Sequence, residues 1–239
     1  MDKRNVLVVG GSSGIGASTV KLLNETGYRT INLDKLEEVN PPPIDHEFVQ
    51  VDLIDQARLV SALEHLQAKF ETFQSVVLLA GVGARRGYES EAGTFDKQLA
   101  INLSSYHCIL STIARSIADG GAVVVTSSTG VYLGVTNLGY AAAKAGVIGL
   151  MRGFALEFAP RAIRVNAIAP GPVDTPMLQS MTTGSERLLL KSCTPLGSLA
   201  APEQISSVIK FLVSDDSSHI TGQVLAIDGG LSLAYRTSL

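Results

Sequence analysis

Short apolar runs rich in Val, Ile and Leu alternate with longer amphipathic segments along the chain. The apolar runs predict strands at residues 5–9, 30–33, 48–51, 75–79, 123–127, 164–169 and 223–227. The longer segments predict helices at residues 17–26, from about 52 to 70, 95–118, 138–158 and 202–213. Because helical segments separate the strands, we expect an α/β fold in which helices cover both faces of a parallel sheet of about seven strands.

Two stretches interrupt this alternation. Pro41-Pro42-Pro43 stand between the strands at 30–33 and 48–51, and proline cannot continue a helix. We therefore expect the crossover helix there to be shortened or absent. Residues 176–200 have no clear period and predict an irregular segment, which would suit a lid over a substrate. Ordinary interface packing would explain the apolar residues of this segment equally well.

Composition narrows the class of protein. The chain has 239 residues, 46% of them hydrophobic, and no linker-like stretch divides it, so we expect one domain over residues 1–239. The net charge of −3 argues against a nucleic-acid partner. The sequence has neither a signal-peptide segment nor an apolar run of the roughly 18 residues that span a membrane, so we expect a cytoplasmic protein. Cys108 and Cys193 lack the spacing of metal ligands, and no metal site is expected.

A glycine-rich turn follows the first predicted strand. The turn reads Gly10-Gly11-Ser12-Ser13-Gly14-Ile15-Gly16 and leads into the helix at 17–26. Glycines let the backbone approach a ligand closely, and a helix amino terminus offers unpaired N–H groups to an anion. The arrangement of strand, turn and helix therefore predicts a pyrophosphate-binding site in a Rossmann-like doubly wound sheet.

Asp34 ends the second predicted strand, on the same edge of the sheet as the glycine turn. A carboxylate there accepts hydrogen bonds from the adenosine ribose and repels a 2′-phosphate, which favours NAD over NADP. Lys35 is the counter-argument, and it reads equally well as a solvated loop residue.

Tyr140 and Lys144 stand four residues apart in the helix predicted at 138–158. Residues at this spacing share one face of a helix, so the ammonium of Lys144 is expected beside the phenol and would favour the phenolate. A tyrosine treated in this way acts as an acid or base near neutral pH. Tyrosine and lysine also meet at this spacing by chance, so the pair needs support from the rest of the chain.

The glycine spacing and the Tyr-Lys pair together resemble those of the short-chain dehydrogenase/reductase family. Gly10, Gly14 and Gly16 match its GxxxGxG pattern, with Val9 in place of the usual threonine. Leu78-Leu79-Ala80-Gly81 stands where the family has NNAG, so the asparagine that ties neighbouring strands is missing. The resemblance continues through Pro170-Gly171 to Asp228-Gly229-Gly230 and covers nearly the whole chain.

This resemblance implies a catalytic set of four residues: Asn102, Ser127, Tyr140 and Lys144. Ser127 lies 13 residues before Tyr140 and three before Gly130, as the family serine does. Ser128 remains possible if the loop after it carries a one-residue deletion. Asn102 would kink its helix and hold a water that reaches the lysine, or it is a satisfied core asparagine.

The resemblance also implies which residues hold the cofactor. Asp52 is expected near the adenine, and it could also cap the following helix. Ala80 and Gly81 would line the cofactor, and Thr175 would help to hold the nicotinamide carboxamide. The full expected set is Gly10, Ser12, Ser13, Gly14, Ile15, Gly16, Asp34, Asp52, Leu53, Ala80, Gly81, Tyr140, Lys144, Pro170, Gly171, Val173 and Thr175.

The implied function is NAD-dependent hydride transfer between a secondary alcohol, or a dihydrodiol, and the corresponding ketone. The segment after Asp34 and the carboxyl-terminal motifs resemble the dihydrodiol dehydrogenases of the family. Arg85 and Arg86 could then hold an anionic substrate group, although they read equally well as a solvated pair. The alternative is a catalytically silent NAD-binding regulatory or structural protein. The long apolar helices predict a homodimer or homotetramer.

Overall fold

The computed structural model describes residues 4–42, 44–83, 93–134 and 137–233. Its centre is one seven-stranded sheet in the order β3-β2-β1-β4-β5-β6-β7, and every neighbouring pair is parallel. The strands are β1 Asn5–Val9, β2 Arg29–Asp34, β3 His46–Gln50, β4 Phe73–Leu78, β5 Ile117–Thr126, β6 Arg164–Pro170 and β7 Val224–Ile227. The order reverses between β1 and β4, which confirms the Rossmann-like, doubly wound sheet.

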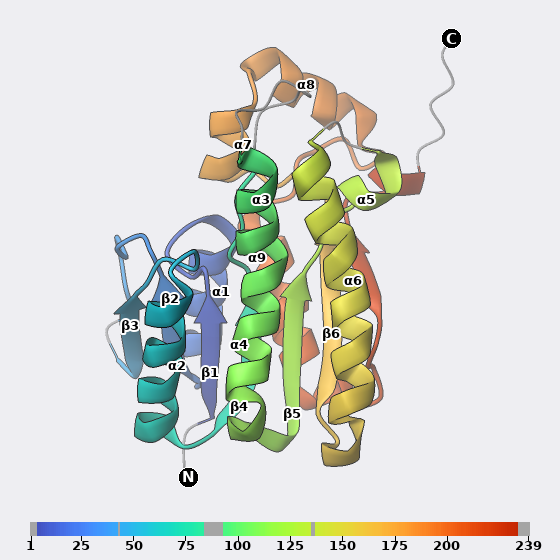
Figure 1. The fold of residues 1–239 in the computed structure, drawn as a ribbon. Coiled ribbons are helices and arrows are strands. Elements are labelled where there is room, and N and C mark those ends of the chain that lie inside the picture. Colours follow the sequence, from blue (N-terminus) through green and yellow to red (C-terminus); the bar gives the residue numbers. More distant parts are fainter. Residues whose placement is uncertain (1–3, 43, 84–92, 135–136, 234–239) are drawn as a thin grey trace.

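Helices lie on both faces of this sheet (Figure 1). The α-helices are α1 Gly14–Glu25, α2 Gln56–Phe70, α3 Thr94–Leu99, α4 Ser105–Ile113, α5 Gly130–Leu133, α6 Leu138–Phe158, α7 Pro176–Met181, α8 Gly184–Cys193 and α9 Pro202–Val213. A π-helical turn, Ala100–Ser104, joins α3 to α4, and short 3₁₀ turns occupy Ala114–Ser116, Ala159–Arg161, Asp215–Ser217 and Leu231–Leu233. None of the described helices is long and apolar enough to cross a membrane.

The core consists of two apolar layers, one on each face. Side chains of α2, α4 and α6 pack on one face, where Leu63, Ile109 and Val147 are fully buried. Side chains of α1 and α9 pack on the other, where Leu23 and Ile209 are fully buried. The strands carry apolar residues on both sides, as a doubly covered parallel sheet requires.

The helix predicted at residues 95–118 is wrong in extent. It is divided by the π-helical turn and ends with the 3₁₀ turn at Ala114–Ser116. Ile117 already belongs to β5, where it pairs with Phe73 of β4. Ile109, Ile113 and Ile117 keep a four-residue spacing across this junction, so the apolar period did not mark where the helix ends and the strand begins.

The two interruptions of the pattern had different outcomes. In the described part of residues 35–45 there is no helix between β2 and β3, which confirms the expectation from the prolines. Residues 176–200 are not irregular, because they contain α7 and α8. Thr175 caps α7 by accepting a hydrogen bond from Leu178 N (3.3 Å), and Thr183 forms a capping box with Glu186 at α8. Short-range caps, rather than a long apolar period, define these helices.

Candidate active site

The glycine turn between β1 and α1 depends on the absence of side chains. Gly10 has a φ of +89°, and a Cβ on it would collide with the backbone of Ala80. A Cβ on Gly16 would collide with the carbonyl oxygen of Gly10. The side chain of Ser13, the N-cap residue of α1, makes no capping hydrogen bond. The first N–H groups of α1 are therefore not capped by that residue, which suits an anionic pyrophosphate.

Asp34 lies at the end of β2, beside this turn. Its Oδ2 accepts a hydrogen bond from Ser12 N (3.0 Å), and its Oδ1 accepts one from Leu36 N (3.0 Å). The two bonds fix the orientation of the carboxylate. Because an ionised carboxylate has about four acceptor positions, Asp34 can still accept hydrogen bonds from ribose hydroxyls.

Behind Asp34 lies a buried polar network that the sequence did not predict. Asn32 accepts a hydrogen bond from Gly11 N (2.8 Å) and donates one to Glu38 (2.6 Å). Glu38 Oε2 also lies 2.8 Å from His46 Nε2. The side chains of His46 and Glu38 are only 5% and 8% exposed. Glu38 belongs to the segment that replaces the crossover helix, so this network connects that segment to the glycine turn. No motif or spacing in the sequence marks these residues.

A cleft runs along the carboxyl ends of β1, β2 and β4. It is lined by most of the expected cofactor residues, namely Gly10, Ser13, Gly14, Ile15, Gly16, Asp34, Asp52, Leu53, Ala80, Gly81 and Thr175. Residues that were not predicted also line it, among them Lys35, Leu36, Val82, Ile101, Pro176 and Met177. These residues fit the adenosine and pyrophosphate groups of a dinucleotide, because glycine backbone, a carboxylate and apolar walls face one space.

Six of the expected cofactor residues do not line this cleft: Ser12, Tyr140, Lys144, Pro170, Gly171 and Val173. The backbone of Ser12 instead orients Asp34. Gly171 packs so closely on Asp228 that a Cβ would lie 2.6 Å from the Cβ of Asp228. Val173 is buried, with 6% of its surface exposed.

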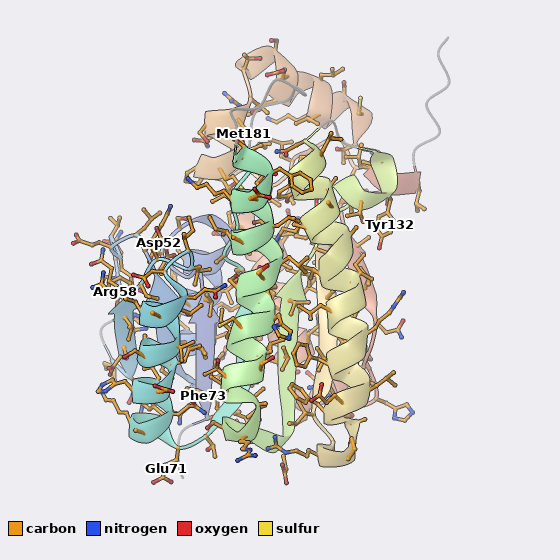
Figure 2. All side chains as sticks on the ribbon, viewed as in Figure 1. Asp52, Arg58, Glu71, Phe73, Tyr132 and Met181 are labelled. Atoms are coloured by element: carbon orange, nitrogen blue, oxygen red, sulfur yellow. The ribbon has the colours of Figure 1, made fainter. Side chains whose placement is uncertain are left out.

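Asp52 is not the cap of α2. The N-cap is Asp55, whose Oδ1 accepts a hydrogen bond from Arg58 N at 3.1 Å. Asp52 accepts one from Ile54 N (3.1 Å) in the turn before the helix, and Figure 2 shows it beyond the end of α2 that carries Arg58. A short turn separates the strand from the helix, so the first acidic residue after the strand lines the cleft while the second starts the helix.

Asn102 lies in the π-helical turn and is fully buried. Its Oδ1 accepts a hydrogen bond from Val82 N (2.9 Å), and its Nδ2 donates one to Val82 O (2.9 Å). The widened turn agrees with the expected kink. The amide connects this turn to the segment after β4, as a satisfied core asparagine would. Asn102 Oδ1 and Lys144 Nζ lie 2.9 Å and 3.5 Å from the position of a Cβ on Gly81, and the water between asparagine and lysine stays a prediction.

Tyr140 and Lys144 lie one turn apart on α6, as their spacing predicted. Lys144 is 2% exposed, and its Nζ donates a hydrogen bond to Thr126 O (2.8 Å). Nζ lies 5.8 Å from the centre of the Tyr140 ring and 3.5 Å from the position of a Cβ on Gly81, so the lysine adjoins the cleft. Burial lowers the pKa of Lys144 to about 7.

The pKa of Tyr140 is shifted in the direction opposite to the one expected from its neighbour Lys144. Burial raises the pKa of Tyr140, and a hydrogen bond with Ser128 opposes that rise. The expected lowering of the phenol pKa by Lys144 is not seen in this geometry. The physical reason is that the buried ammonium is itself destabilised and makes its hydrogen bond with Thr126.

The serine next to Tyr140 is Ser128 rather than Ser127. Ser127 is 1% exposed and its hydroxyl donates to Lys144 O at 2.8 Å, while its N–H still bonds Ile168 O at 2.8 Å in the sheet. Ser128 accepts a hydrogen bond from Gly130 N (3.1 Å) and bonds the Tyr140 hydroxyl. The Ser127 hydroxyl is thus directed to the backbone of α6, and Ser128, the alternative that the sequence left open, is the serine beside Tyr140. A loop one residue shorter than the family spacing accounts for the difference.

Helix α7 passes over the cleft. At its start, the Thr175 methyl group lies 3.1 Å from where a Cβ on Gly14 would be. At its end, Met181 packs against Gly83 so tightly that a Cβ there would collide with the thioether. Figure 2 shows Met181 near the top of α3. Arg85 and Arg86, expected to serve an anionic substrate, lie outside the described residues. Within those residues, no group of three or more His, Cys, Asp or Glu side chains is placed to hold a metal ion.

Comparison with known families supports this geometry. A family model described as "Enoyl-(Acyl carrier protein) reductase" matches residues 9–232. The chain belongs to the short-chain dehydrogenase/reductase family. It is 34% identical to a 3-oxoacyl-[acyl-carrier-protein] reductase of Thermotoga maritima, with 94% of this chain and 96% of the relative covered.

Two further relatives of this short-chain dehydrogenase/reductase bear on its chemistry. It is 32% identical to the cis-4-hydroxycyclohexanecarboxylate dehydrogenase of Sinomonas cyclohexanicum, over 95% of this chain and 96% of the relative. Its fold matches a solved structure of ElxO with NADP bound, with a TM-score of 0.87, 28% identity and coverage of 96% and 99% of the two chains. The protein is thus an oxidoreductase of a family that binds nicotinamide cofactors.

Proposed function

We propose that the protein transfers hydride reversibly between NAD and a secondary alcohol or the corresponding ketone. The observation that carries this proposal is the hydrogen-bonded pair of Ser128 and Tyr140, with Lys144 one helical turn further on. A phenol and a hydroxyl that meet beside a dinucleotide cleft can together hold one substrate oxygen. Nicotinamide supplies the hydride chemistry when it is bound.

The side chains would divide the proton chemistry among them. Ser128 would donate a hydrogen bond to the substrate oxygen, and Tyr140 would take the hydroxyl proton in oxidation or return it in reduction. Lys144 would bind the cofactor ribose through its ammonium. Asn102 would support the path by which the proton reaches solvent, through its contact with the segment after β4.

Asp34 supports the choice of NAD over NADP. One of its oxygens is held by Ser12 N of the glycine turn and the other by Leu36 N, and a 2′-phosphate beside it would meet a fixed negative charge. Lys35, which also lines the cleft, is the competing feature because its ammonium could neutralise such a phosphate. The ElxO relative with NADP bound makes this choice the first to test.

A cyclic secondary alcohol, including a dihydrodiol, is the substrate class we propose. The similarity to a dehydrogenase of a hydroxycyclohexanecarboxylate supports it. Arg85 and Arg86 stay a prediction for the anionic group of such a substrate. Assembly into a homodimer or homotetramer also stays a prediction, supported by Leu138 and Leu156 of α6, which are 62% and 79% exposed.

The first experiment is a titration of the protein with NADH and with NADPH, followed by the fluorescence of the reduced nicotinamide. The chain contains no tryptophan, so protein emission will not interfere. We expect NADH to bind at least about tenfold more tightly than NADPH, or about 1.4 kcal/mol. Tighter binding of NADPH would assign the selection to Lys35, and failure of both to bind would contradict the proposed activity. Cofactor binding without turnover across a panel of cyclic alcohols and ketones would instead favour a silent NAD-binding protein.

A further inference from the structure

A second tyrosine lies beneath the candidate active site. Tyr106 of α4 is fully buried and stands four residues after Asn102, on the same side of the helical segment. Its hydroxyl lies 3.0 Å from Leu78 O and 2.9 Å from Ala80 O. Burial raises the pKa of Tyr106 well above its usual value, so the phenol keeps the proton that it shares between the two carbonyls.

These two carbonyls bracket the segment in which this chain departs from its family. Leu78-Leu79-Ala80-Gly81 lacks the asparagine that normally ties neighbouring strands there. Ala80 in turn donates its N–H to Val9 O (2.8 Å) and packs against the backbone of Gly10. A displacement of Ala80 would therefore reach the glycine turn.

The ring of Tyr106 has a different contact. Lys144 Nζ lies 5.4 Å from the centre of this ring and 5.8 Å from the centre of the Tyr140 ring, so the ammonium stands between two aromatic side chains. The face of an aromatic ring attracts a cation within about 6 Å. Because burial lowers the pKa of Lys144 to about 7, any contact that favours the charged form matters near neutral pH.

We propose that Tyr106 is a positioning residue whose two ends act on different parts of the cofactor site. Its hydroxyl holds the Leu78–Ala80 backbone, of which Leu79 and Ala80 line the cleft, in place of the missing asparagine. Its ring holds the Lys144 ammonium at the side of Gly81, where the lysine adjoins the cleft. This inference rests on the proposed function, because it assumes that a nicotinamide cofactor occupies the cleft.

The two tasks can be separated by substitution. Tyr106→Phe removes the hydroxyl and keeps the ring, whereas Tyr106→Leu removes both. Tyr28→Phe is the matched control, since Tyr28 is also buried (9% exposed) and its hydroxyl bonds Arg4 at the opposite end of the sheet. The readouts are the Kd for NADH, measured by fluorescence between about pH 6 and pH 9, and the melting temperature from circular dichroism.

The wild-type Kd should rise with pH through the pKa of Lys144, because binding draws on the ammonium. Tyr106→Phe should weaken NADH binding about tenfold at every pH, because two buried carbonyls lose their donor, without moving the midpoint of the pH dependence. Tyr106→Leu should weaken it further and move the midpoint to lower pH, because the cation loses the ring that favours it. Tyr28→Phe should lower the melting temperature and leave the Kd within about twofold of wild type.

Each result that contradicts these expectations leads to a different conclusion. If wild type binds NADH and both Tyr106 variants bind it equally well, with only lower melting temperatures, Tyr106 is an ordinary core residue and the inference is overturned. If Tyr106→Phe moves the pH midpoint as far as Tyr106→Leu does, the assignment of that effect to the ring is wrong. If wild type binds neither cofactor, the proposed function falls, and the inference with it. Tyr106→Met replaces the leucine variant if the latter does not fold.

Discussion

The two halves of the candidate active site are built on opposite principles. In the half formed by β1, β2 and the glycine turn, polar groups already bind one another, from His46 through Glu38 and Asn32 to Gly11. In the half formed by β5 and α6, burial acts against charge and shifts the pKa values of Tyr140 and Lys144 in opposite directions. The first half is organised to hold a ligand without changing its own state. The second half contains groups whose protonation must change, and such groups are where perturbed pKa values concentrate.

The strongest way to separate the halves is Tyr140→Phe. We expect turnover to fall by about 10³-fold or more, because the acid or base is removed, while the Kd for NADH changes by less than about threefold. Steady-state kinetics and the nicotinamide fluorescence titration measure the two quantities. A variant that kept more than about a tenth of the wild-type turnover would show that another group moves the proton.

A pair of neighbouring serines tests the chemical half alone. Ser128→Ala should lower kcat/KM by about 10²-fold, because the hydroxyl that meets Tyr140 is lost. Ser127→Ala should instead cost about 1 kcal/mol of stability, because Lys144 O loses its donor, and leave kcat/KM within about fivefold. Steady-state kinetics of both variants measure the change in kcat/KM, and thermal unfolding measures the change in stability. The reverse ranking would restore Ser127 to the role that its spacing suggested.

The smallest expected effect comes from the binding half. Glu38→Gln removes a charge from the buried network, and we expect the Kd for NADH to rise about threefold to tenfold with kcat nearly unchanged. Glu47→Gln is the control, since Glu47 belongs to the same region but pairs with the partly exposed Lys69. Equal Kd values for the two variants would mean that the network does not support the glycine turn. A fall in kcat as large as the rise in Kd would show that the network supports the chemical half as much as the binding half.

Short-range patterns predicted the parts of the site that neighbours in sequence determine. The glycine turn, Asp34 and the Tyr140-Lys144 pair were all found this way, because a turn, a strand end and one helical turn fix their positions. Ser128 was not chosen, because its place depends on the length of a loop rather than on residue type. The pattern of apolar and polar residues could not show that the Ser127 hydroxyl donates a hydrogen bond to Lys144 O.

The residues that sequence analysis missed act across long distances in the chain. Tyr106 bonds carbonyls 26 and 28 residues away, and Asn32 bonds Gly11, 21 residues away. A polar residue inside an apolar helix or strand signals that it needs a partner, but it does not say which one. For Tyr106 the indication of a partner was weaker still, because tyrosine also packs in an apolar core through its ring.

The strand order also bears on the tendency of the molecule to aggregate. A sheet with the order β3-β2-β1-β4-β5-β6-β7 has β3 and β7 as its edge strands, and an exposed edge is a template on which another chain can pair. Each edge is blunted differently. On β3, Glu47 forms an ion pair with Lys69 at 2.6 Å, which places charge along the border. On β7 the strand is only four residues long, too short to offer a continuous ladder of hydrogen bonds. We expect both features to disfavour the pairing of a further chain with the sheet.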